Sequence, residues 1–152
     1  MASEADAGMS GTAGAERLHG HCLCGGVTLS VAAGTHDVHA CHCGACRRFH
    51  GGPAMVLLAG TDVRIESGES LVHRFASSEW AERAFCATCG SSLFFRTIGD
   101  GGHFVAAGLF DEIPGARFES EIFVDAKPGW YTLADPEEHL TGEEFFARIG
   151  GG

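Results

Sequence analysis

The chain has 152 residues, 45% of them hydrophobic and 20% charged, proportions that suit one globular domain with its own core. Ten basic residues stand against 20 acidic ones, so the formal net charge is −10 at pH 7. Such a surface repels phosphate backbones and anionic lipid, which argues against nucleic-acid and membrane-surface binding.

The first 16 residues, MASEADAGMSGTAGAE, are small or polar and follow neither a strand nor a helix period. They predict a disordered N-terminal tail over residues 1–16. The tail lacks the basic flank and apolar core of a secretion signal, and no stretch approaches the roughly 18 apolar residues of a membrane span. We therefore expect a cytoplasmic protein, in which cysteines serve more often as metal ligands or catalytic groups than in disulfides.

From Arg17 the sequence is typical of short strands joined by turns that contain glycine, aspartate and proline. Residues 27–31 alternate between apolar and polar side chains, which is the period of a half-buried strand. Residues 54–60 and 92–98 are short apolar runs that suit buried strands, and further candidates are 72–77, 103–110 and 121–125. These segments predict a mainly β, mainly antiparallel domain over residues 17–134.

Two short helices are also predicted. Residues 44–49, GACRRF, suit a single helical turn. Near the end of the chain, Thr141 stands three residues before Glu144, the spacing of a capping box, and Gly150 follows as a stop signal. Residues 135–152 are therefore predicted to form a C-terminal helical tail.

The seven cysteines form three groups in the sequence, namely Cys22 and Cys24, then Cys41, Cys43 and Cys46, then Cys86 and Cys89. Two closely spaced cysteines in a tight turn can meet one ion, and a second pair completes a tetrahedral zinc site of four thiolates. Combining the first and last groups gives such a closed, structural site. The middle group then supplies three ligands, and three protein ligands with a fourth position open to water or substrate are typical of a catalytic zinc.

The spacing leaves other assignments open. The two sites can share the ligands differently, and the three-thiolate site can borrow His42, His50 or a residue of a distant loop. A CxxC pair can be a redox dithiol, although no thioredoxin-like βαβ pattern surrounds either pair. An iron–sulfur cluster and two purely structural zinc ions also agree with the number of thiols.

Arg47 and Arg48 directly follow Cys46. A zinc ion with three thiolates carries a net negative charge, so cations are expected near it. The two arginines either only neutralise the cluster or lie on the surface, or one of them holds a carboxylate of the substrate through a bidentate pair. His50, four residues beyond Cys46, is the candidate for a general base, and the alternative is a solvated loop residue.

In these residues the sequence resembles the glutathione-dependent formaldehyde-activating enzymes, a group that includes relatives of centromere protein V. The resemblance rests on GHCLCGGVTL, CHCGACRRFHGGP and RAFCATCGSSLFF in that order, supported by GLFDEI and KPGWY, and it covers about residues 17–133. It implies an Mss4-like antiparallel β-sheet fold with a short C-terminal helix. It also implies a structural zinc on Cys22, Cys24, Cys86 and Cys89, and a second, reactive zinc on Cys41, Cys43 and Cys46.

The activity that the resemblance implies is the reversible addition of glutathione to formaldehyde, which gives S-(hydroxymethyl)glutathione. An enzyme that catalyses the reverse reaction is a carbon–sulfur lyase. The expected cofactor is zinc, two ions per chain, and the expected partners are a thiol, with glutathione as co-substrate, and an aldehyde. Arg47, Arg48 and His50 are then the candidate substrate-contacting or catalytic residues beside the three cysteines. The alternative function is a non-catalytic, zinc-containing interaction module.

Overall fold

The structure, a computed structural model, describes residues 16–34, 36–134 and 136–150, so nearly all of the predicted N-terminal tail lies outside the described residues. The strands are β2 (Arg17–His21), β3 (Thr28–Ala32), β4 (Val38–Cys41), β5 (Ala54–Gly60), β6 (Val63–Ser67), β7 (Val72–Ala76), β8 (Ala81–Cys86), β9 (Ser92–Thr97), β10 (His103–Ala106), β11 (Phe118–Ile122) and β12 (Glu138–Leu140). The helices are α1 (Gly44–His50) and α2 (Gly142–Arg148), with 3-10 turns η3 (Glu69–Leu71), η4 (Ala107–Leu109) and η5 (Val124–Ala126). No helix within these ranges has the length and apolarity needed to cross a bilayer.

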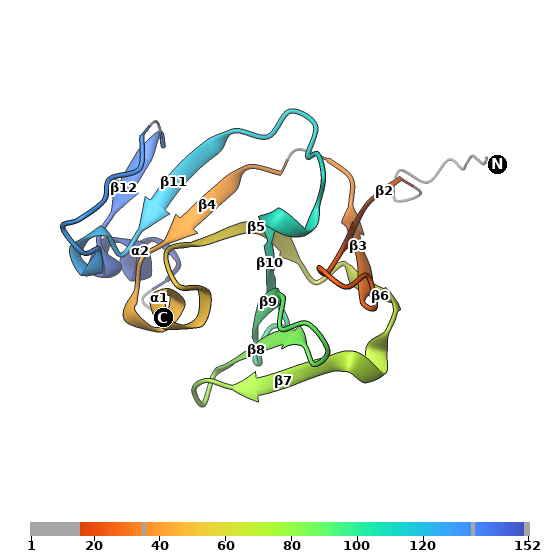
Figure 1. Cartoon of the computed structure of the whole chain (residues 1–152). Helices are drawn as coiled ribbons and strands as arrows, with labels where there is room; N and C mark the ends of the chain where they lie inside the picture. The colour runs from red at the N-terminus through yellow and green to blue at the C-terminus, as the bar shows by residue number, and fades with distance from the viewer. Residues whose placement is uncertain (1–15, 35, 135, 151–152) are drawn as a thin grey trace.

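The strands form two sheets. The larger sheet has eight strands in the order β12-β11-β4-β5-β10-β9-β8-β7, and the smaller has three in the order β2-β3-β6. Figure 1 shows β4, β11 and β12 at the upper left, the smaller sheet at the right and β7 to β9 below. The predicted mainly β architecture with a short C-terminal helix is confirmed. The pairs of β11 with β4 and with β12 are parallel, which the strand pattern of the sequence does not predict.

The core lies between the smaller sheet and the middle of the larger one. Leu29 and Val31 of β3 are fully buried and belong to the same apolar cluster as Leu57 of β5 and Val105 of β10. Burying side chains of this size stabilises the fold by roughly 1.5–3 kcal/mol each. The predicted alternation of residues 27–31 therefore places its apolar members in the core.

Most predicted strands appear close to their predicted positions. Residues 54–60, 72–77 and 92–98 correspond to β5, β7 and β9. The unpredicted strands are β2, β4, β6, β8 and β12, in which polar residues interrupt the apolar pattern, as in HGH, VRIES and AERAFC. These strands form because neighbouring strands pair with them, which is a tertiary effect.

Two predicted strands differ from those observed. The segment 103–110 is extended only to Ala106, since the chain then turns through η4. The segment 121–125 is shifted toward its N-terminal side, because β11 ends at Ile122 and Phe123 takes a left-handed φ of 57°. A non-glycine residue in that region interrupts the strand.

The terminal helix α2 has the predicted cap. The backbone N–H of Glu144 donates to Thr141 Oγ1 at 3.0 Å, and the N–H of Thr141 donates to Glu144 Oε1 at 2.9 Å. Phe123 packs against Phe145 and Phe146 of this helix, with ring centroids 6.1 and 5.5 Å apart. The division of the chain after residue 134 stays a prediction, and beyond it β12 pairs with β11.

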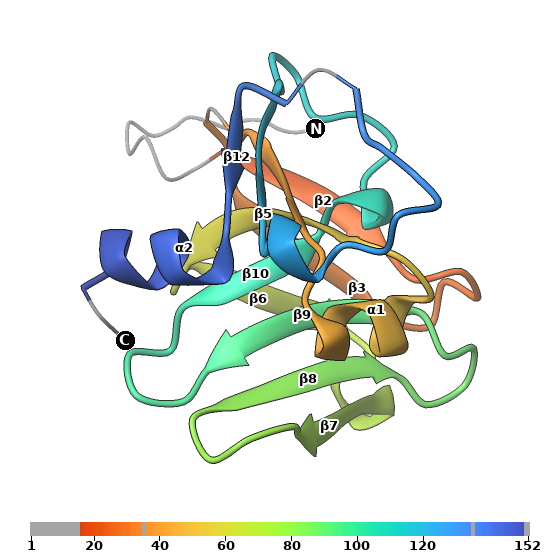
Figure 2. The same ribbon diagram turned by 90° about the vertical axis from the view of Figure 1, so that its left-hand side faces the viewer.

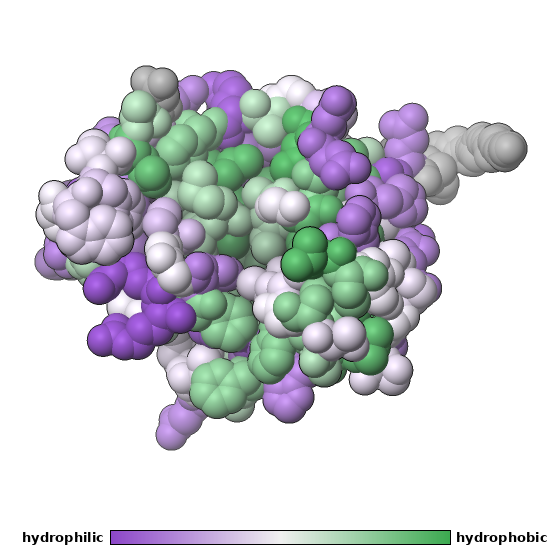
Figure 3. All heavy atoms as spheres, viewed as in Figure 1, coloured by the Kyte–Doolittle hydropathy of each residue, from purple (hydrophilic) through white to green (hydrophobic). Residues whose placement is uncertain are grey.

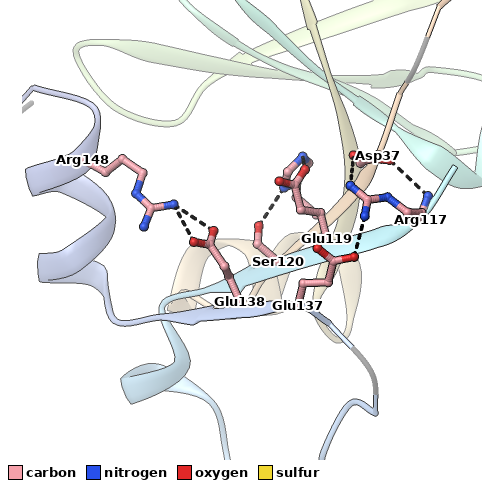
Figure 4. A network of polar contacts seen from close by, with 8 residues as sticks. Asp37, Arg117, Glu119, Ser120, Glu137, Glu138 and Arg148 are labelled. Atoms are coloured by element: carbon pink, nitrogen blue, oxygen red, sulfur yellow. Dashed lines mark hydrogen bonds and ion pairs between the residues drawn. The ribbon is translucent and has the colours of Figure 1, made fainter.

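Ion pairs connect the segments at the edge of the larger sheet, where β4, β11 and β12 lie. Figure 4 shows Arg117 between Asp37 and Glu137, and Arg148 of α2 on both carboxylate oxygens of Glu138. The side chains of both arginines are more than half exposed, so each pair contributes only about 0–1 kcal/mol. The pairs link the C-terminal segment to residues next to β4 and β11 with only a small gain in stability.

Candidate metal centres

Four cysteines form the first cluster. Cys22 and Cys24 follow β2, whereas Cys86 ends β8 and Cys89 lies in the next turn, and their four Sγ atoms all lie within 4.8 Å of one another. The Sγ atoms of Cys22 and Cys24 are 3.6 Å apart, and those of Cys24 and Cys86 are 3.9 Å apart. Four sulfurs held about 2.3 Å from a tetrahedral zinc lie roughly 3.8 Å from each other. The cluster therefore has the spacing of a four-sulfur metal site and could hold an ion.

Backbone amides point at these sulfurs. The N–H of Val27 donates to Cys22 Sγ at 3.3 Å, and the N–H of Gly26 donates to Cys24 Sγ at 3.4 Å. Gly90 has a φ of 80°, which turns the chain back after the second pair. Hydrogen bonds to sulfur favour the thiolate, which is the form that binds metal.

Ser91 joins the two turns of this cluster. Its Oγ accepts the backbone N–H of Leu23 at 2.9 Å and lies 3.2 Å from Cys89 Sγ. Hydrogen bonds from the side chain and backbone of Ser91 lower the pKa of Cys89 to about 5. This lowered pKa favours the thiolate of Cys89, which is the form that binds metal.

Cys41, Cys43 and Cys46 form the second cluster. Cys41 ends β4, Cys43 is the N-cap of α1, and Cys46 lies in the first turn of that helix. Their Sγ atoms lie within 4.8 Å of one another, and no fourth Cys, His, Asp or Glu of the described ranges joins them. Three sulfurs occupy three corners of a tetrahedron, so a bound ion would keep one position for a non-protein ligand.

The thiols of the second cluster shift one another's pKa values in opposite directions. Hydrogen bonds from Cys41 and Cys46 lower the pKa of Cys43, while the hydrogen bond with Cys43 raises the pKa of Cys41. Three neighbouring thiolates repel one another unless a cation lies among them. Metal binding is the process that would let all three lose their protons.

His42 lies between two of these cysteines in sequence, but its side chain makes other contacts. It is fully buried, with Nδ1 2.6 Å from the Tyr131 hydroxyl and Nε2 2.7 Å from Glu121 Oε1. Glu121 also pairs with His139. Burial raises the pKa of Glu121, but the hydrogen bonds from His139 and His42 outweigh burial and keep that pKa below its ordinary value. His42 thus ties β4 to β11 and to Tyr131.

Glu121→Ala is expected to lower the free energy of unfolding of the metal-loaded protein by about 3 kcal/mol. The substitution leaves Nε2 of the buried His42 ring without its partner, so that only the contact of Nδ1 with Tyr131 remains. Urea unfolding at a fixed zinc concentration measures the change. The control is Glu119→Ala on the same strand, where the carboxylate is 39% exposed and lies 3.8 Å from His39, and a change within about 0.5 kcal/mol is expected. Equal effects of the two substitutions would contradict a special role for Glu121.

Arg83 of β8 also lies at the second cluster, although the predicted site residues do not include it. It is 6% exposed, and its Nη1 lies 3.6 Å from Cys46 Sγ. On the same face of β8, Phe85 packs against Phe49 of α1 at 6.2 Å between ring centroids, while Cys86 on the other face belongs to the core. Figure 2 shows α1 in front of β8 and β9. One face of β8 therefore contributes Cys86 to the first cluster, and the other face brings Arg83 to the second cluster.

The two predicted arginines line a hollow beside the second cluster. Arg47 Nη1 donates to the carbonyl of Ala126 at 3.5 Å, and Arg48 Nη1 donates to that of Gly44 at 3.2 Å. The hollow measures about 260 Å³ and is lined by Arg47, Arg48, Gly51, Gly52, Pro128, Trp130 and Tyr131. Figure 3 shows a hydrophilic area over the place that α1 occupies in Figure 1. The hollow thus combines two guanidinium groups with an aromatic wall.

The predicted base, His50, is the last residue of α1 and is half-buried. Burial lowers its pKa, and the positive charge of Arg83 lowers it further. The ring is therefore neutral near pH 7 and able to accept a proton.

Comparison with known proteins gives three findings. The model of one family, the glutathione-dependent formaldehyde-activating enzymes, matches residues 17–126, which include all seven cysteines. A Schizosaccharomyces pombe (strain 972) protein described as an uncharacterized lyase is 32% identical over 131 residues, which make up 86% of this chain and 95% of that protein. The crystal structure of a Rhodobacter sphaeroides protein is similar with a TM-score of 0.55 at 25% identity, over 63% of this chain and 90% of that one.

Proposed function

The chain belongs to the family of glutathione-dependent formaldehyde-activating enzymes, and on this premise we propose that it is a zinc-dependent carbon–sulfur lyase. It would add a thiol, glutathione in the first instance, reversibly to formaldehyde or a related aldehyde. The observation that carries the proposal is the cluster of three cysteines that no fourth protein ligand completes within the described chain. A four-cysteine cluster beside it accounts for the remaining thiols.

The donor atoms of both clusters suit zinc. Sulfur ligands select zinc or iron–sulfur clusters over hard cations, and the sulfur spacing of the first cluster fits a tetrahedral ion. Cys22, Cys24, Cys86 and Cys89 would hold a structural zinc, and Cys41, Cys43 and Cys46 would hold a second one. Zinc bound at the second cluster would supply a Lewis acid that promotes the loss of a thiol proton or polarises an aldehyde oxygen.

The proposed reaction balances without any redox step. The sulfur of the thiol forms a bond to the carbonyl carbon, the π-electron pair moves to the oxygen, and the proton lost by the thiol is returned to that oxygen. In the reverse direction the carbon–sulfur bond breaks and the aldehyde is released. We assign the proton transfer to His50, because it ends α1, the helix that carries Cys46, and its lowered pKa keeps the ring able to take up and return a proton.

Recognition of the thiol is proposed for the hollow that Arg47 and Arg48 line. Glutathione carries two carboxylates, and a guanidinium binds a carboxylate through two parallel hydrogen bonds. Trp130, 76% exposed beside Tyr131, offers an apolar surface to the rest of such a ligand. A thiol without carboxylates would lose these contacts.

The zinc-loaded protein is expected to accelerate the exchange between glutathione plus formaldehyde and S-(hydroxymethyl)glutathione by at least about a hundredfold over the uncatalysed reaction. Exchange spectroscopy of the hydroxymethyl protons measures this rate directly. The Cys46→Ser variant, which should stay folded, is the first control, and 2-mercaptoethanol, a neutral thiol, is the second and should react more slowly. No acceleration with any thiol and aldehyde, at two zinc ions per chain, would refute the proposal.

The second candidate function is a zinc-containing interaction module. It is favoured by apolar side chains on and beside the larger sheet, where Leu58, Phe75 and Trp80 are 51%, 55% and 55% exposed. Exposed apolar patches often mark contacts with other proteins. In a pure module both metal ions would be structural, so every cysteine substitution would unfold the chain and no thiol would be turned over.

A further inference from the structure

Arg83 is a buried cation that forms no ion pair with a carboxylate in the part of the chain that the structure describes. Arg83 is 6% exposed, and its Nε is buried without a hydrogen-bond partner among the described residues. Burying an uncompensated charge is strongly destabilising, so a fold that keeps a guanidinium inside must place negative charge beside it. The negative charge must therefore come from a group that Arg83 contacts.

The side chain of Arg83 is held against the second cysteine cluster. Its guanidinium carbon lies 4.9 Å from the ring centroid of Phe95 and 5.7 Å from that of Phe49. Phe49 belongs to α1, the helix that also carries Cys46, and Nη1 donates to Cys46 Sγ at 3.6 Å. Two aromatic rings thus fix the guanidinium while one of its edges faces a sulfur.

Other arginines of the same sheet are paired differently. Arg74 of β7 and Arg96 of β9 both donate to Glu82 Oε2 at 3.2 Å, and both are partly exposed. Glu82 is the neighbour of Arg83 in sequence, but successive side chains on a strand point to opposite faces. Glu82 therefore pairs with arginines of the two neighbouring strands, and the polar group that Arg83 contacts is the Cys46 sulfur.

We propose that Arg83 is the positioning residue of the second metal site, where its guanidinium balances the charge of the metal–thiolate unit and orients the Cys46 sulfur. The inference rests on the proposed second zinc and deepens it. A divalent ion with three thiolates carries a net negative charge, which opposes the binding of an anionic ligand. A guanidinium brings the unit to neutrality, so the site accepts a further thiolate, the chemical class of the proposed substrate, with less repulsion. Partners of this kind tune a metal through its ligands.

The test compares three variants by their metal binding. In Arg83→Met the charge is lost with little change in volume, and the affinity for the second zinc ion, measured by competition with a chromophoric chelator, should fall about 10- to 100-fold. The absorption bands of Co²⁺ bound in its place should shift as well. Arg83→Lys should recover part of the affinity, because it keeps the charge but not the planar fork. Arg96→Met, the matched control on the neighbouring strand, should bind both ions as the unmodified protein does.

Metal affinity separates this inference from lyase activity, because an inactive protein would still show the effect. A folded Arg83→Met variant that retains the first ion and binds the second with unchanged affinity and spectrum would overturn the inference. If the methionine variant does not fold, arginine side-chain NMR of the unmodified protein decides. Loading of the second ion should then shift one guanidinium resonance and slow its proton exchange, and an unchanged resonance would overturn the inference.

Discussion

Cys46→Ser is expected to remove one of two zinc ions and to lower turnover more than about a hundredfold while the fold persists. Loss of a partner outside the ligand shell already reduces metal affinity or activity roughly 10- to 100-fold, and loss of a ligand should exceed this. A serine hydroxyl is a harder and more weakly acidic donor than a thiol and replaces it poorly on zinc. Elemental analysis counts the ions, and proton exchange spectroscopy measures the turnover.

The fold should survive Cys46→Ser because this cysteine lies in α1, a helix of seven residues that contributes nothing to the main apolar cluster. The matched control is Ala45→Ser, which adds a hydroxyl at an exposed position of the same helix and should keep two ions and full activity. A Cys46→Ser protein that unfolds, or one that retains turnover, would contradict a reactive role for the second cluster.

Cys86→Ser is expected to abolish cooperative folding. Cys86 is fully buried in the core and ends β8, so its sulfur connects the apolar interior to the first cluster. Structural zinc contributes about 10–16 kcal/mol to the folding of zinc-finger peptides, as much as the whole 5–15 kcal/mol by which a typical domain is stable. Thermal unfolding followed by circular dichroism should lose its transition, and excess chelator should have the same effect on the unmodified protein.

Ala87→Ser, in the exposed turn directly after Cys86, is the control for that substitution and should unfold at an unchanged temperature. If Cys86→Ser kept a cooperative transition, the first cluster would not be the structural site. The opposite outcomes expected for Cys46 and Cys86 distinguish an enzyme with one reactive ion from a module that needs both ions to fold.

The cysteine groups within each turn could be predicted from spacing because their members are local. Cys22 with Cys24, and Cys86 with Cys89, each lie in one turn, and Cys41, Cys43 and Cys46 lie at a single strand–helix junction. The chain between such turns needs only to bring two of them together. The grouping predicted from the number and spacing of the thiols is therefore the grouping that the structure shows.

The polar partners of the second cluster could not be predicted in the same way. Arg83 follows Cys46 by 37 residues and reaches it only because β8 faces α1, while Glu121 meets His42 through the parallel pairing of β11 with β4. An arginine at an inward position of a strand, three residues before a CxxC pair, is the one local sign of such a role. Strand order and register decided these contacts, and neither has a marker in the local pattern.

The placement of the two clusters next to opposite faces of β8 has a consequence for a cell in which zinc is scarce. The proposed reactive ion would be bound by three sulfurs at the end of a short helix, and the proposed structural ion by four sulfurs against the interior. The more weakly held ion would leave first, and the folded scaffold would remain to be reloaded. A shortage of zinc would thus stop the proposed reaction reversibly, before the protein unfolds and is degraded.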